Sequence, residues 1–219
     1  GVTEWTLSNR VRVVIKPTEF KQDEILFSAF SKGGQSLVST EDLVSAALAT
    51  DVVSVSGIAD MTMTDLQKAL TGKNVSYSPS INANTESVDG GSTVKDLETL
   101  LQLNYLYFTA PRRDEDAYAM LMSILESQLA NRDKNPKSAF SDSIKMMSSN
   151  NSPRAIILNT EALKKANMDK ALEIYKARFA NPADFTFFFV GNIDPNDKNF
   201  QMQVRTWLGG LKTNKKRET

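Results

Sequence analysis

The chain has 219 residues, of which 41% are hydrophobic and 24% are charged, as is usual for a soluble globular protein. Its 26 lysines and arginines balance 26 aspartates and glutamates, so the charge favours neither nucleic acid nor an anionic membrane as a partner. The chain has no histidine and no cysteine, which excludes Ser-His-Asp triads, disulfides and zinc sites with imidazole or thiolate ligands. Only carboxylates remain as strong metal ligands, and they suit calcium or magnesium better than zinc.

The first elements alternate like a sheet and then change to helix. Residues 7–17 place valines on one face and arginines on the other, which predicts a strand, and residues 24–34 predict a second strand closed by two glycines. Ser39 followed by Asp42 is a capping-box pattern that predicts the start of a helix, and Gly57 predicts its end.

The middle of the chain predicts one short and one long helix around two extended segments. Thr62 with Asp65 starts a helix that runs through Leu70, and residues 74–91 read as two short strands with a Gly-Gly stop. Thr93 and Asp96 cap the next helix, which Pro111 ends. Its apolar residues recur at steps of three and four: Val94, Leu97, Leu101, Tyr105 and Phe108.

The last part predicts further helices around one buried strand. Asp114 opens a helix, residues 136–147 form another, and residues 150–154 break it. A helix over residues 168–179 leads into an apolar strand at residues 185–190, and residues 195–208 form the final helix. The first of these helices has an inner stripe of Ala117, Leu121, Leu125 and Leu129.

This order of elements lacks strict βαβ alternation and predicts an α+β fold, with helices packed on a mainly antiparallel sheet. We expect a single domain over residues 1–219, with residues 212–219 as a linker or tail. No stretch approaches the ~20 apolar residues of a membrane span, and no signal peptide is present. The chain begins at Gly1 without an initiator methionine, and we expect it to be a piece of a longer protein.

Asp51 conflicts with its surroundings in the helix that Gly57 ends. Helical periodicity places Asp51 on the same face as Val44, Ala47, Leu48 and Val55. Because an unpaired buried carboxylate is costly, Asp51 either faces a partly wet cleft, pairs with a distant Lys or Arg, or acts as a general base or metal ligand. The conflict does not by itself decide between these alternatives.

Several stretches together resemble one homologous domain of the insulinase/pitrilysin-type zinc peptidases. They are LSNRVRVVIKP, FSAFSKGG, the helix ending in SG, PRRDEDAY, and ALEIYKARFANPADFTFFFVGNID, of which FANPADFTFFFVGNID is the most specific. The resemblance spans residues 5–211. The most similar type is that of the large four-domain bacterial members, the PqqL-like zinc proteases, and within them the third domain.

The resemblance implies a LuxS/mitochondrial-processing-peptidase-like metallohydrolase fold, an antiparallel sheet with helices on one face. Family members have two halves that close around an unfolded peptide, and the first domain holds zinc through a His-x-x-Glu-His motif. The expected partners are therefore the other domains of the same polypeptide and an unfolded peptide substrate. By resemblance, the expected location is the periplasm or cell envelope.

Aligned by Gly57, this helix has Leu48, Asp51 and Val52 where an active domain has its two histidines and catalytic glutamate. A later zinc-binding glutamate falls near Glu126. The resemblance thus implies a zinc-motif helix without its ligands: no metal and no catalytic residue in this chain, with zinc in the catalytic domain of the parent protein.

Three functions follow as alternatives. The first is a non-catalytic domain of a zinc metalloendopeptidase, part of the half that closes over the peptide. The second is a stand-alone protein–protein interaction or assembly scaffold of the same fold. The third is an independent enzyme that uses the carboxylates of Asp51 and Glu126, for which the sequence offers no substrate pocket.

Overall fold

The computed structural model describes residues 1–216, in which six strands form one sheet with the order β1-β2-β6-β3-β5-β4. The strands are β1 (Thr3–Thr6), β2 (Arg12–Pro17), β3 (Ile25–Lys32), β4 (Val75–Ile81), β5 (Thr85–Ser92) and β6 (Thr186–Gly191). Neighbouring strands are antiparallel except β2 and β6, which run parallel. The predicted α+β class with a mainly antiparallel sheet is confirmed.

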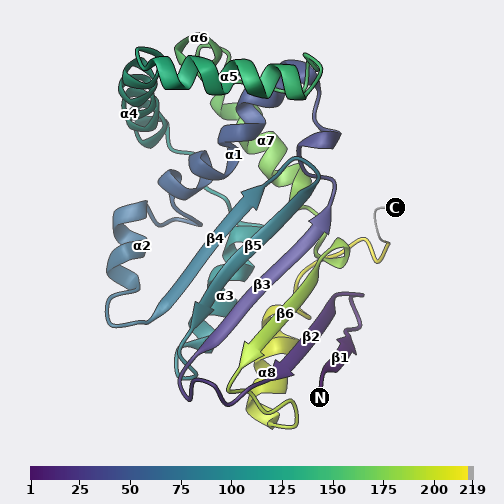
Figure 1. The fold of residues 1–219 in the computed structure, drawn as a ribbon. Helices are drawn as coiled ribbons and strands as arrows, with labels where there is room; N and C mark the ends of the chain where they lie inside the picture. Colours follow the sequence, from purple (N-terminus) through teal and green to yellow (C-terminus); the bar gives the residue numbers. More distant parts are fainter. Residues whose placement is uncertain (217–219) are drawn as a thin grey trace.

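The helices cover one face and one end of this sheet. They are α1 (Leu43–Ser56), α2 (Met63–Ala69), α3 (Leu97–Thr109), α4 (Glu115–Asp133), α5 (Pro136–Ser148), α6 (Thr160–Leu163), α7 (Met168–Arg178) and α8 (Lys198–Trp207). Figure 1 shows α3 and α8 behind the sheet, α1 and α7 at one end of it, and α4, α5 and α6 beyond them.

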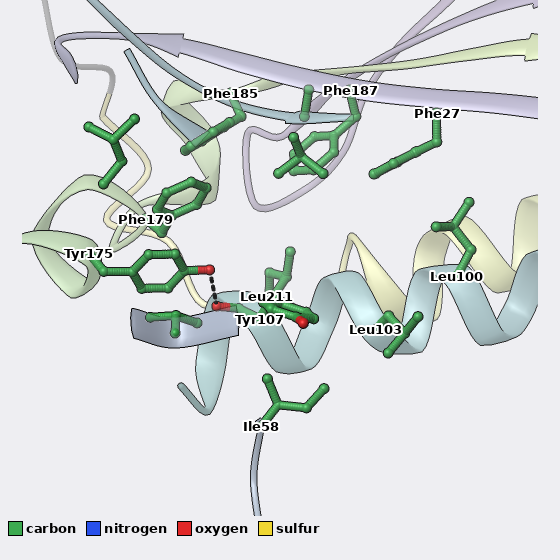
Figure 2. Close-up of a cluster of buried hydrophobic side chains, with 14 of the residues drawn as sticks. Phe27, Ile58, Leu100, Leu103, Tyr107, Tyr175, Phe179, Phe185, Phe187 and Leu211 are labelled. Carbon is green, nitrogen blue, oxygen red and sulfur yellow. Dashed lines mark hydrogen bonds between the residues drawn. The ribbon is translucent and has the colours of Figure 1, made fainter. Parts of the chain in front are cut away.

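The core lies between the sheet and the helices and is rich in aromatic rings (Figure 2). Phe187 on β6 is fully buried and packs against Phe27 on β3. At one end of the cluster, Phe179 stacks on both Tyr175 of α7 and Phe185, with ring centroids 4.5 and 5.5 Å apart. Such rings bury a large apolar area each, so this cluster fixes α7 and β6 against each other.

Two short elements were not predicted, because each lacks a strong pattern. Strand β1 has four residues and pairs only with β2, at the sheet edge. Helix α6 is a single turn, capped by the side chain of Asn159, which accepts a hydrogen bond from the amide of Ala162. Both lie below the length at which periodicity is informative.

Of the four helix starts predicted from capping residues, two are confirmed and two are shifted. Thr62 and Asp65 form a capping box at α2, and Asp114 caps α4 through the amide of Ala117. Helix α1 instead begins at Leu43, after a 3-10 turn whose preceding residue Ser39 makes no capping bond to the backbone. Helix α3 likewise begins at Leu97 rather than at Val94, because Thr93 and Asp96 bond to each other before the helix starts.

The inner stripe predicted for α4 is only partly buried. Leu129 is the one buried residue of this helix, while Ala117, Leu121 and Leu125 are half-buried. The reason is position: α4 lies beyond α1, away from the sheet (Figure 1), where it packs mainly against α1, α5 and α6 and remains partly open to solvent.

The segment predicted as a linker or tail, residues 212–219, is described up to Lys216, and residues 217–219 lie outside the described part. Thr213 donates a hydrogen bond to the backbone carbonyl of Asn9, and the Asn181 side chain donates one to the carbonyl of Lys216. Up to Lys216 the segment is therefore bonded to the surface of the fold. Its role as a linker remains a prediction.

Candidate functional site

Helix α1 packs closely against several neighbouring elements. Its buried residues are mostly small, and it packs chiefly against α7 and also against α4 and β4. Ser45 accepts a hydrogen bond from the backbone amide of Asn167, just before α7, and Ser56 donates to the carbonyl of Val52 inside the helix. These bonds satisfy hydroxyls that the packing removes from water.

Gly57 ends α1 because its backbone leaves the helical region. Its φ is 80°, a conformation that favours glycine, and a β-carbon there would collide with the carbonyl oxygen of Met61. Arg112 then ties this end of α1 to the start of α4: its guanidinium donates to the carbonyl of Ser56 and pairs with Asp114. The hydrogen bond from the amide of Ala117 and the ion pair with Arg112 hold the pKa of the Asp114 carboxyl below its usual value.

Asp51 is exposed, so the expectation of a carboxylate within a buried face is wrong. The buried side of α1 is centred on Ala49 and Val53, about half a turn away from Asp51. Of the residues that share its face, Ala47 and Val55 are only half-buried. Apolar side chains surround this helix, and therefore the sequence alone could not show which side faces the core. Partial loss of hydration still raises the pKa of the Asp51 carboxyl above its usual value.

Leu48 and Val52 belong to the core, with exposed fractions of 2% and 0%. Neither side chain can ligate a metal, and a histidine at either position would be buried among apolar groups. Asp51, between them in sequence, faces solvent. The three residues that the resemblance aligns with a zinc motif therefore do not fit zinc. In residues 1–216, no group of three or more carboxylates, histidines and cysteines is close enough to hold a metal ion.

Glu126 lies on the exposed side of α4 that faces α6. It lines an open groove of about 490 Å³ between these helices, together with Tyr118, Met122 and Lys164. The described lining residues of this groove do not include Asp51. The structure thus gives no shared cavity to Asp51 and Glu126, and the carboxylate-enzyme alternative gains no support from the geometry.

Sequence reasoning missed a buried ion pair near the other end of α1. Glu86 of β5 is 1% exposed, and its carboxylate lies 3.8 Å from the guanidinium of Arg178 at the end of α7. The same carboxylate accepts a hydrogen bond from the amide of Gly34, in the turn after β3. The two residues are 92 positions apart, and a buried glutamate between Thr85 and Ser87 carries no local signal of its partner. This ion pair holds the turn after β3 in place, so its role is structural.

Two curated proteins of much greater length match the chain. It is 30% identical over 196 residues to "Zinc protease PQQL-like" of Arabidopsis thaliana, covering 89% of this chain and 18% of that protein. It is 23% identical over 212 residues to "Probable zinc protease PqqL" of Escherichia coli K12, covering 97% of this chain and 22% of that protein. This chain matches a domain of PqqL-like zinc proteases. The chain spans about a fifth of the length of these relatives. No protein-family model matches the chain.

Solved structures confirm the PqqL-like fold. The periplasmic protease PqqL of Escherichia coli superposes with a TM-score of 0.80 at 23% identity, over 97% of this chain and 23% of that one. The first half of PqqL, solved separately, gives 0.70 at 14% identity, over all of this chain and 48% of that one. An inactive domain of peptidase M16 from Pseudomonas fluorescens gives 0.75 at 14%, over 98% of this chain and 52% of that one.

No helix within residues 1–216 combines the length and the apolar character that crossing a membrane requires.

Proposed function

We propose that this chain is a non-catalytic domain of a zinc metalloendopeptidase and forms part of the half that closes over the peptide substrate. The observation that carries the proposal is which side chains of α1 occupy the positions aligned with the zinc motif. Its zinc-motif positions hold two buried aliphatic side chains, Leu48 and Val52, and one exposed aspartate, Asp51. At these positions the chain therefore lacks the imidazole ligands and the glutamate with which a zinc peptidase binds zinc and activates water.

The match to PqqL supports a place outside the catalytic half of the parent. The chain aligns better with the whole of PqqL than with its first half alone, by identity and by TM-score. An alignment lying within the first half would score alike against both structures. The higher score against the whole protein is what a match to the second half would give, and it supports our proposal that the chain is the third domain. In this proposal, zinc and the catalytic groups belong to another domain of the parent. By the same similarity, the parent is a periplasmic or envelope protein.

A domain of this kind contributes shape rather than chemistry. Closing over a peptide excludes water from the site and limits which peptides fit, and extended peptides are held through backbone contacts that require no short motif. The other domains of the polypeptide and the unfolded peptide are its partners in this proposal.

The test uses the full-length parent protein and a fluorogenic peptide substrate. Asp51→Ala is expected to leave kcat within about twofold of wild type, because the carboxylate faces solvent and has no metal to serve. Substitution of the glutamate in a His-x-x-Glu-His motif elsewhere in the parent is the matched control, and it should abolish turnover. A loss of orders of magnitude with folded Asp51→Ala would overturn the proposal, as would a parent that carries no such motif.

A further inference from the structure

Helix α5 presents its apolar side to solvent. Phe140, Ile144 and Met147 are four and three residues apart, which places them on one side of the helix, and they are 69%, 50% and 77% exposed. No residue of α5 is buried. The half-buried positions lie on the opposite side and are mostly polar: Ser138, Asp142, Met146 and Ser149.

Polar contacts hold α5 in this orientation. Asp142 pairs with Arg132 at the end of α4, and the Asn135 side chain caps the first turn through the amide of Lys137. Lys145 donates a hydrogen bond to the backbone carbonyl of Ile156, in the segment that follows the helix. The helix is therefore anchored through its polar side, which leaves the apolar side turned outward. An amphipathic helix normally does the reverse.

The exposed apolar side carries little charge. Of the three charged residues in α5, Asp142 lies on the opposite side in its ion pair, and Lys145 reaches back to the Ile156 carbonyl. Only Lys137, in the first turn, borders the apolar side. Aromatic and methionine side chains with few charges are the composition of the core of a protein interface. A solvated helix face would instead carry charges.

We propose that this α5 face, formed by Phe140, Ile144 and Met147, docks against another domain of the same polypeptide. The chain spans 18% and 22% of its curated relatives, so a full-length protein of this type has several times more chain available to cover the face. The partner surface is apolar and poor in charge, because a buried unpaired charge opposite these side chains would be costly. The inference rests on the part of the proposed function that places the chain inside a longer protein.

The α5 face is separate from the positions that carry the proposed function. No α5 residue lines the groove beside Glu126, and Leu48 and Val52 lie in the core. A test of docking therefore reports on α5 alone. If the docking proposal fails, the result of the peptidase assay on Asp51→Ala still stands. If that assay contradicts the proposed function, the docking result still stands.

Methionine oxidation in the full-length protein measures whether the face is covered. Met147 is the reporter, and Met202 on α8, 57% exposed, is the reference. With dilute hydrogen peroxide and peptide mass spectrometry, Met147 is expected to oxidise at least about tenfold more slowly than Met202, since the rate follows exposure. The two rates should converge in concentrated guanidinium. Equal rates in the folded protein would overturn the proposal.

A pair of substitutions then identifies what covers the face. Ile144→Asp should restore fast oxidation of Met147, whereas Ala139→Asp, exposed on a different side of α5, should leave it slow. Protection that grows with protein concentration would indicate a second copy of the protein, and protection that appears only after adding an unfolded peptide would indicate substrate. Either result would overturn docking to a neighbouring domain. Protection of Met147 that depends neither on protein concentration nor on added peptide supports docking to a neighbouring domain.

Discussion

The hydroxyl of Tyr175 donates a hydrogen bond of 3.0 Å to the backbone carbonyl of Tyr107, joining α7 to the last turn of α3 (Figure 2). This carbonyl lacks a helical partner because the residue four positions later is Pro111, which has no amide hydrogen. The tyrosine thus supplies the donor that the proline removes. Burial raises the pKa of the Tyr175 hydroxyl well above its ordinary value, so it remains a donor at physiological pH.

Replacing Tyr175 by phenylalanine should destabilise the fold while keeping the ring packing. We expect the free energy of unfolding to fall by about 1–3 kcal/mol, because a buried carbonyl loses the donor that replaces its helical partner. Tyr105→Phe is the matched control, since Tyr105 is half-buried on α3, the helix that supplies the carbonyl, and it should change stability by less than about 0.5 kcal/mol. Urea denaturation followed by circular dichroism measures both. Equal effects would contradict the assigned role.

Arg178→Met should be more damaging than its surface counterpart. It removes the guanidinium beside the buried carboxylate of Glu86, and we expect a loss of about 3 kcal/mol in the free energy of unfolding. Lys176→Met, exposed on the same helix, should cost less than about 0.5 kcal/mol. Thermal unfolding of the two variants compares them directly, and similar melting temperatures would show that the ion pair contributes little.

The chain should bind no stoichiometric zinc, because the positions that the resemblance aligns with a zinc motif offer one exposed aspartate and two buried aliphatic side chains. The double variant Leu48→His/Val52→His should not create a site either. Both imidazoles would enter the core, so we expect a marked loss of stability in place of metal binding. Elemental analysis after dialysis against zinc, with Asp51→Ala as a folded control, measures this. One tightly held zinc per wild-type chain would refute the assignment of these positions.

Asp51→Asn should stabilise the protein at neutral pH and have little effect in acid. The folded state raises the pKa of this carboxyl, so it holds the proton more tightly than the unfolded chain does. Stability is therefore lost as the pH rises from the ordinary aspartate value through the raised one, and the cost persists at pH 7. Because the side chain is exposed, the expected gain is at most about 0.5 kcal/mol. Thermal melts of both proteins at neutral pH and below pH 3 test the sign; a larger gain in acid would reverse it.

The sequence by itself determined the fold class and most elements. The capping box at Thr62 and Asp65, the cap at Asp114 and the stop at Gly57 depend on neighbouring residues only, so local chemistry specifies them. The apolar run of β6 indicated a buried central strand. In the structure β6 pairs with β2 on one edge and β3 on the other, and helices cover one of its faces. The lack of histidine and cysteine likewise excluded most zinc chemistry from composition alone.

Only the tertiary structure decided which side of each helix is buried. Helix α1 is apolar nearly all round, and contact with α7 rather than periodicity turned Asp51 to solvent. Helix α5 has a clear apolar stripe, yet the pair between Arg132 and Asp142 turns that stripe outward. The link from Glu86 to Arg178 joins residues far apart in the chain. In each case the deciding contact is made by another element, and the free energy of burial depends on that neighbour as well as on the local sequence.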